Sequence, residues 1–140
     1  MGKPGLLTKI FNWLGTIWGG SIRFTVPLLF AVGFVANFLI GGLSGIFMAS
    51  TPFDIYIHDT YFIVAHFHYV VAGIIFAIFA GLYYWYPKMF GRMWNNPLGY
   101  LHFAGTFIFF HMTFFPMHIL GIGGHMRRIA EPQQYQFLQP

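Results

Sequence analysis

The chain has 140 residues, of which 57% are hydrophobic and only 7% are Asp, Glu, Lys or Arg. Soluble domains carry about 25% charged residues, so a water-soluble fold of this composition would expose large apolar patches, and a membrane protein is predicted instead. The formal net charge of +4 comes from residues that flank the apolar runs, which argues against a nucleic-acid-binding surface, and the lack of cysteine excludes disulfides and thiolate metal sites.

Residues 1–24 are predicted to form an amphipathic element at the membrane interface. The stretch from Phe11 to Trp18 is short, aromatic and amphipathic. Tryptophan is favoured where hydrocarbon meets water, which supports an interfacial position. The segment lacks the apolar run and cleavage site of a secretory signal.

Three charge-free runs follow, and each predicts one transmembrane helix. Charged residues are absent between residues 24 and 53, between 60 and 87, and between 93 and 126. A helix needs roughly 20 apolar residues to cross the hydrocarbon core. We therefore expect helices near residues 25–50, 60–87 and 97–119. The fold class is an all-α membrane protein, whose three-helix region at 25–120 is part of a larger helical bundle.

Proline and glycine mark the expected links between these helices. The segment Thr51-Pro52-Phe53-Asp54 is expected to break the first helix, and Pro87 with Gly91 is expected to end the second. Pro116 is expected to kink the third. Residues 121–140 are predicted to be a polar C-terminal tail, extended from residue 130 onward.

The positive residues predict the orientation of the chain. Five of them lie on one side of a three-span arrangement: Lys3, Lys9, Arg23, Lys88 and Arg92. Only Arg127 and Arg128 lie on the other side, together with all three acidic residues. Because cytoplasmic loops are enriched in Lys and Arg, the N-terminus is predicted to be cytoplasmic and the link at 51–59 and the tail to face outward.

Two intramembrane histidines are the most informative residues of the chain. His66 and His68 lie in the predicted second span, where ionisable groups are costly and usually functional. At 100° per residue they point about 200° apart, so they are poorly placed to chelate one metal together. Each fits axial ligation of a separate haem on its own side of the helix. The alternative is a satisfied interhelical hydrogen bond for each.

The remaining histidines leave several interpretations open. His58 and Asp59 either cap the second helix or bind a hard cation through carboxylate oxygen. On the third span His111 and His118 share a face and His102 lies roughly opposite, and all three are candidates for hydrogen-bonded core groups. His125 is expected at the surface.

The arginine pair near the C-terminus also has two interpretations. Arg127 and Arg128 follow the third span directly. They are placed either to bind anionic groups such as haem propionates or to face solvent and lipid headgroups.

Together these motifs resemble a known family. The stretch from His58 to Val70, HDTYFIVAHFHYV, resembles the signature helix of the main subunit of cytochrome c oxidase and its haem–copper relatives. The similarity extends back to Gly41-Gly42-Leu43-Ser44-Gly45 and forward through residues 112–116, His118, Gly121 and the arginine pair. It spans roughly residues 11 to 130, with several motifs in family-like order.

The resemblance implies roles for the histidines. His66 would be the proximal ligand of a high-spin haem that binds oxygen. His68 would be one axial ligand of a low-spin haem. Phe67 would lie between the two haems on the electron path.

The resemblance also implies roles for the charged residues of the outer end. His58 and Asp59 would help to bind magnesium. Arg127 and Arg128 would hold haem propionates. The implied cofactors are two haems, expected to be of the a type, magnesium, and copper bound by ligands outside this chain.

The resemblance implies a haem-binding portion of a terminal oxidase that couples electron transfer and oxygen reduction to proton translocation. Its partners would be the remaining helices of the catalytic subunit, a copper-bearing second subunit, cytochrome c or quinol as electron donor, and membrane lipid. Nucleic acid is not an expected partner. The expected location is a bacterial-type plasma membrane or the mitochondrial inner membrane.

The chain departs from the family pattern in what it lacks. The copper-ligand histidines, the tyrosine cross-linked to one of them, the second axial histidine and the proton-channel lysine and glutamate belong to helices that are absent here, as does the final helix. Met126 stands where the family usually has proline. No catalytic residue is expected in this chain alone, and we expect an inactive isolated chain, a split piece or fragment that needs its complement.

Two other hypotheses remain at this stage. The chain could be a membrane anchor that only carries electrons, with His66 or His68 paired with His111 on one haem. It could also be an inactive fragment that folds and binds nothing.

Overall fold

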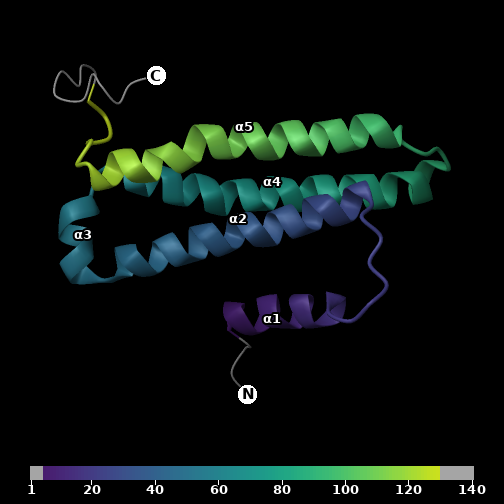
Figure 1. The fold of residues 1–140 in the computed structure, drawn as a ribbon, viewed down its shortest axis with the longest axis horizontal. Helices are drawn as coiled ribbons and strands as arrows, with labels where there is room; N and C mark the ends of the chain where they lie inside the picture. Colours follow the sequence, from purple (N-terminus) through teal and green to yellow (C-terminus); the bar gives the residue numbers. More distant parts are fainter. Residues whose placement is uncertain (1–4, 130–140) are drawn as a thin grey trace.

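The computed structural model describes residues 5–129, and these form five helices. They are α1 (Leu6–Ile17), α2 (Val26–Ala49), α3 (Thr51–Ile57), α4 (Tyr61–Phe90) and α5 (Asn96–Ile122). Helices α2, α4 and α5 lie side by side as long rods, α3 crosses one end of them, and α1 runs alongside α2 (Figure 1). The predicted all-α fold is confirmed.

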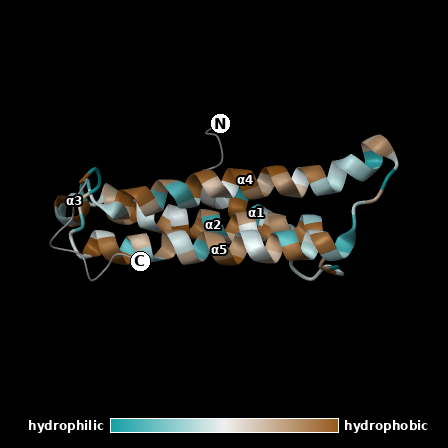
Figure 2. Cartoon of the chain, turned by 90° about the horizontal axis from the view of Figure 1, so that it is seen from above, coloured by the Kyte–Doolittle hydropathy of each residue, from teal (hydrophilic) through white to brown (hydrophobic). Residues whose placement is uncertain are grey.

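The three expected spans correspond to α2, α4 and α5. Each is long and apolar enough to cross a membrane. Hydrophobic residues occur along the whole length of the three rods and on their outer sides (Figure 2). A helix that is apolar all round suits lipid better than water, since an outer face in water would be polar. Residues 5–129 therefore contain three membrane-spanning-type helices, as the charge-free runs predict.

The ends of the helices differ slightly from the expected bounds. α2 ends at Ala49, and a new short helix, α3, begins at Thr51 with Pro52 in its first turn. Proline is tolerated there because the N–H that it lacks would have no partner in the helix. α4 continues past Pro87 to Phe90 and ends at Gly91, whose φ of 67° is the left-handed conformation that glycine adopts readily.

The link residues gather at the two ends of the bundle. The connections at 18–25 and 91–95, which contain Arg23 and Arg92, lie at one end, and α3 and the end of α5 lie at the other (Figure 1). Of the other lysines in the predicted positive group, Lys9 lies on α1 beside the bundle, and Lys3 lies outside the described residues. Which end faces the cytoplasm stays a prediction.

Helices α2 and α4 make the most extensive interface of the described bundle. Small residues of α2 permit it: a Cβ added at Gly33 would lie 3.0 Å from the Phe76 ring, and one at Gly41 would lie 3.0 Å from Val70. In lipid, helices associate through close packing rather than the hydrophobic effect. Phe30 and Phe76 are fully enclosed, with ring centroids 5.7 Å apart, and together with Val26 they form the buried core.

Helix α1 packs against the outside of α2. The Trp13 and Phe34 rings lie with centroids 5.8 Å apart, and Ile10 is buried. In Figure 1 α1 runs along the bundle beside α2. The interfacial position of residues 1–24 stays a prediction.

We predict that Gly121→Ala weakens the bundle. A Cβ at Gly121 would overlap the Phe62 backbone at the start of α4, so the α4–α5 contact must open. Overpacking of this kind costs about 1–3 kcal/mol. The measurement is the unfolding of the detergent-solubilised chain as SDS is added, monitored by the circular dichroism signal of its helices. Gly42→Ala is the matched control: a Cβ there meets nothing within 4 Å, so stability should hold or rise. Equal stability of the two variants would contradict this packing.

Candidate functional site

Helix α4 carries both intramembrane histidines, on the two flanks of its packed face. The buried residues Ala65, Tyr69 and Ala72 mark that face. His66 lies beside α2, where its ring meets Ser44 and Gly45. His68 lies beside α5, where its ring stacks on Phe114. The structure thus places the two imidazoles on separate sides of one helix, as the spacing predicts.

Hydrogen bonds around His66 fix the orientation of its ring. Ser44 Oγ lies 2.9 Å from His66 Nδ1 and 2.9 Å from the Gly41 carbonyl oxygen. Both contacts are satisfied when the hydroxyl hydrogen goes to the carbonyl and Oγ accepts a hydrogen from Nδ1. The proton of the neutral ring is then on Nδ1, and Nε2 keeps the lone pair that a metal needs. A Cβ at Gly45 would lie 3.0 Å from His66 Cε1, so glycine leaves room for the ring.

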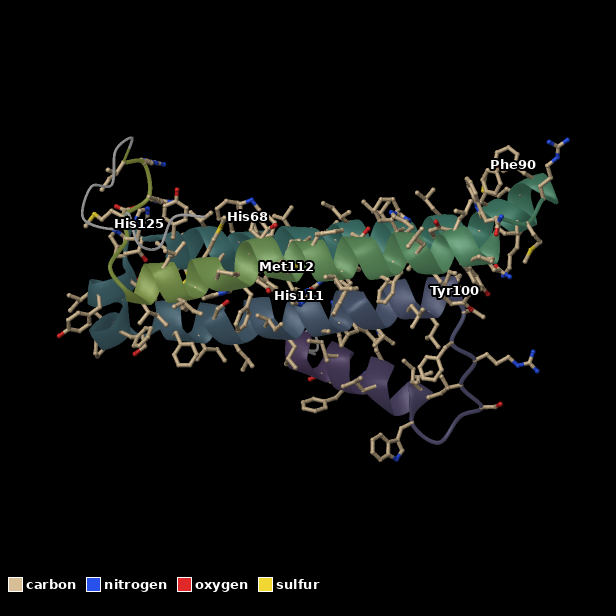
Figure 3. All side chains as sticks on the ribbon, turned by 45° about the horizontal axis from the view of Figure 1, so that its top comes forward. His68, Phe90, Tyr100, His111, Met112 and His125 are labelled. Carbon is tan, nitrogen blue, oxygen red and sulfur yellow. The ribbon has the colours of Figure 1, made fainter. Side chains whose placement is uncertain are left out.

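His68 reaches the same tautomer in another way. Its Nδ1 lies 2.7 Å from the Val64 carbonyl oxygen, one turn back on the same helix. Because a carbonyl only accepts, Nδ1 must donate, and Nε2 is again the available ligand atom. The His68 and Phe114 rings are stacked at 4.2 Å and 19°, which supports the imidazole from the α5 side. In Figure 3 His68 lies toward the end of the bundle where His125 is found.

Phe67 projects away from the packed face of α4. Its side chain is 43% exposed, and its ring centroid lies 4.2 Å from that of His68. It therefore stands between the two histidines on the open side of the helix. That position fits the role that the sequence resemblance implies.

The histidines of α5 make contacts within the bundle. His111 Nδ1 donates to the Phe107 carbonyl oxygen at 2.8 Å, and its ring packs edge-on against Tyr69 at 5.5 Å. His118 also packs on Tyr69, at 5.4 Å, so these two histidines share a face as predicted. His102 bonds to the Tyr83 hydroxyl at 3.1 Å. His102 and His111 are therefore hydrogen-bonded, as expected, but only half-buried.

A set of contacts that we call the clasp joins the start of α4 to the segment after α5. It consists of residues 59–61 with residues 125–127. Thr60 and Met126 form an isolated antiparallel bridge, and the Arg127 N–H donates to the Asp59 carbonyl oxygen at 2.9 Å. The Arg127 Nε and one terminal nitrogen also donate to Asp59 Oδ1. Asp59 itself has a φ of 57°, an uncommon conformation for a residue other than glycine.

The charged side chains at the clasp are Asp59 and Arg127, with His58 beside them, and their contacts bear on the predicted magnesium site. The Arg127 guanidinium, first by hydrogen bonding and then by its charge, holds the pKa of the Asp59 carboxyl below its ordinary value of 3.8. His58 Nε2 lies 3.6 Å from Asp59 Oδ2, and His58 Nδ1 lies 3.5 Å from Asp54. Within residues 5–129 no group of three ligand-type side chains is arranged to hold a metal ion. Magnesium would therefore need ligands beyond these side chains, and the His58–Asp59 site stays a prediction.

His125 is not the surface residue that we expected. Its side chain is only 6% exposed, and its ring lies 4.7 Å from that of Tyr61. The Tyr61 N–H donates to its carbonyl oxygen at 3.0 Å. The expectation failed because the sequence did not reveal that the chain after α5 turns back onto the start of α4. Residues 130–140, predicted to be extended, lie outside the described part of the chain.

Ser44 is the site residue that sequence reasoning missed. It was considered only as one small residue in Gly41-Gly42-Leu43-Ser44-Gly45. The available signal was its hydroxyl, because a polar group inside a membrane helix needs a partner and the second span offered an imidazole.

The two imidazoles thus lie on opposite flanks of a membrane-spanning-type helix, each with Nδ1 engaged, which is the arrangement that supports a metal-binding histidine. The family model described as Cytochrome C and Quinol oxidase polypeptide I matches residues 4–140. The chain therefore belongs to this family, as a fragment of the subunit, and its homologues are oxidoreductases of respiratory electron transport.

Individual relatives support the same assignment. A cytochrome c oxidase subunit 1 from Synechocystis sp. is 59% identical over 123 residues, which cover 87% of this chain and 22% of that protein. Another, from Bacillus sp. (strain PS3), is 56% identical over 122 residues, covering 86% and 20%. A probable cytochrome c oxidase subunit 1-beta from Nocardia farcinica is 55% identical over 124 residues, covering 88% and 21%. The chain thus spans about a fifth of the length of the relatives that it matches.

We predict that Arg127→Gln raises the pKa of Asp59 toward 3.8, because both the hydrogen bonds and the positive charge are lost. A lowered folded-state pKa stabilises the fold above the unfolded-state pKa, and this stability is lost as the pH falls through the folded-state pKa. The variant should therefore lose stability near neutral pH and converge with the parent chain in acid. Carboxyl carbon NMR of Asp59 measures the titration.

Arg128→Gln is the control for this prediction, since Arg128 is exposed and acts on Asp59 only through its charge. Its effect should be smaller, and added salt should reduce it further. Equal shifts in the two variants would mean that Arg127 is not bonded to Asp59.

Proposed function

We propose that this chain provides haem-binding helices of a terminal oxidase that couples electron transfer and oxygen reduction to proton translocation. His66 ligates the iron of the high-spin, oxygen-binding haem, and His68 provides one axial ligand of the low-spin haem. The chain contributes no catalytic residue that acts alone and is inactive without its complement.

The observation that carries this proposal is that two imidazoles on one helix both have Nδ1 hydrogen-bonded, which favours the same tautomer for each. Both His66 and His68 have Nδ1 engaged as a donor, which leaves Nε2 as the ligand atom on each. A partner on the other ring nitrogen is the usual support of a metal-bound histidine, because it fixes the tautomer and the ring orientation. Two such side chains inside a charge-free run of a membrane helix would be costly for packing alone.

The remaining residues act around the haems in this proposal. The bound haems supply the oxygen binding and the electron transfer, while the protein sets their positions and surroundings. Phe67 fills the space between them on the exposed side of α4. Arg128 and the part of the Arg127 guanidinium that Asp59 leaves free bind propionates, and His58 with Asp59 contributes to a magnesium site completed by other ligands.

The proposal includes partners and a membrane location. The remaining helices of the subunit supply the copper ligands and the second axial histidine, a copper-bearing second subunit and cytochrome c or quinol deliver electrons, and lipid surrounds the spans. The membrane is a bacterial-type plasma membrane or the mitochondrial inner membrane. The N-terminus faces the cytoplasm or matrix, and the end of α5 faces outward.

A second candidate is a membrane anchor that carries electrons on a haem held within this chain. His111 favours it, because its Nδ1 donates to Phe107 and leaves its Nε2 available. The His68 imidazole stacks on Phe114 of α5 instead of opposing His111, which disfavours a haem held between these two histidines.

We predict distinct spectral losses when the two histidines of α4 are replaced separately. His66→Ala should abolish the carbon-monoxide-sensitive haem signal, because the high-spin iron loses its protein ligand. His68→Ala should abolish the insensitive signal and leave the sensitive one. The measurement is a reduced-minus-oxidised spectrum, with and without carbon monoxide, of the chain purified from its native membrane with the proteins that accompany it.

His111→Ala separates the two candidates. An oxidase component should keep both signals in this variant. A single carbon-monoxide-insensitive haem that disappears with His111 would establish the anchor instead. The absence of haem from the unsubstituted assembly would reject both candidates and leave an inactive fragment.

A further inference from the structure

We infer that Ser44 is a positioning residue for His66: its hydroxyl, held by Gly41, fixes the imidazole so that Nε2 faces the metal. This inference rests on the proposed function, since it concerns the histidine proposed to bind the high-spin haem. It assigns to α2 a part in the ligand geometry of α4.

One arrangement of hydrogens satisfies both contacts of the Ser44 hydroxyl. The residue is 5% exposed, so water cannot replace its partners easily. Its Oγ lies 2.9 Å from the Gly41 carbonyl oxygen, which can only accept, and 2.9 Å from His66 Nδ1. The hydroxyl therefore donates to Gly41 and accepts from His66. The Gly41 bond points the Oγ lone pair toward the imidazole and polarises it, as in other hydrogen-bond chains.

The Nδ1 bond of His66 differs from those of His68 and His111, and like the bond between His102 and Tyr83 it joins two helices. His68 and His111 each donate to a carbonyl one turn back on their own helix, Val64 and Phe107. Those bonds form wherever the helix forms. The bond of His66 crosses from α4 to α2, so it depends on how the two helices are packed.

The packing of α2 is suited to this role. Next to Ser44, Gly45 has no side chain, and any Cβ would press on the His66 ring at 3.0 Å. One turn earlier, Gly41 brings the helices together at Val70. The glycines thus bring the hydroxyl within bonding distance of Nδ1. Within the described residues, Ser44 Oγ is the hydrogen-bond partner of His66 Nδ1, and no second one replaces it.

The bond from Ser44 should affect the strength of the iron–nitrogen bond at His66 as well as the direction in which Nε2 points. A donor bond from Nδ1 shifts electron density toward Nε2 and makes the imidazole a stronger ligand. Removing the acceptor should weaken the iron–nitrogen bond at His66 alone. His68, with a carbonyl acceptor on its own helix, should be unaffected.

The test is resonance Raman spectroscopy of the reduced oxidase assembly, which reports the iron–histidine stretching frequency of the five-coordinate haem. Ser44→Ala should shift this frequency downward, because the Nδ1 bond is lost. Ser44→Thr keeps a hydroxyl and should restore it. Ser50→Ala, an exposed serine just after α2, is the control and should leave it unchanged. The carbon-monoxide-insensitive haem band in the same samples is an internal reference.

Each outcome decides the inference. An unchanged frequency in Ser44→Ala, or a shift that Ser44→Thr fails to reverse, would overturn it and leave haem binding by His66 intact. If Ser44→Ala loses the high-spin haem, retention of that haem in Ser44→Thr supports the hydroxyl role, and loss from both variants overturns it. An unsubstituted assembly without a carbon-monoxide-sensitive haem would instead reject the proposed function, and the inference with it.

Discussion

The close approach of α2 to α4 is the constraint on which the rest of the structure depends. Lipid is as apolar as the helix surfaces, so the two helices gain little from simply hiding hydrophobic area. They associate because Gly33 and Gly41 let the side chains of Phe76 and Val70 sit against bare backbone. The same approach brings Ser44 within hydrogen-bonding distance of His66. Helix packing and the support of a candidate ligand are therefore one feature, produced by a single row of small residues.

Charge-free runs and helical spacing were enough to predict much of this molecule. They placed α2, α4 and α5 to within a few residues, because a run of twenty or more apolar residues matches the length of a helix that crosses the hydrocarbon core. They also placed His66 and His68 on different sides of α4, because that follows from 100° per residue. The position of a helix, and the side of it on which each residue lies, can be predicted in this way without knowledge of the neighbouring helices.

Features that depend on two distant segments could not be predicted in the same way. The burial of His125, the pairing of Asp59 with Arg127 and the bond from His66 to Ser44 each join residues far apart in the sequence. Hydropathy carries no information on such pairs. α3 was missed for a local reason: Pro52 was taken only as a helix breaker, although proline also suits the first turn of a new helix.

The two candidate ligands, His66 and His68, differ in how they respond to a displacement of α2 relative to α4. His68 is held by its own helix, so its tautomer survives any displacement of α2 that leaves α4 intact. His66 is held by α2, so the same displacement changes the direction and strength of its ligand atom. Substitutions along the α2 glycines, even ones distant from any haem, should therefore act on one centre and spare the other. In the proposed oxidase, one haem would only pass electrons and the other would bind oxygen, and the asymmetry would then act on the oxygen-binding haem.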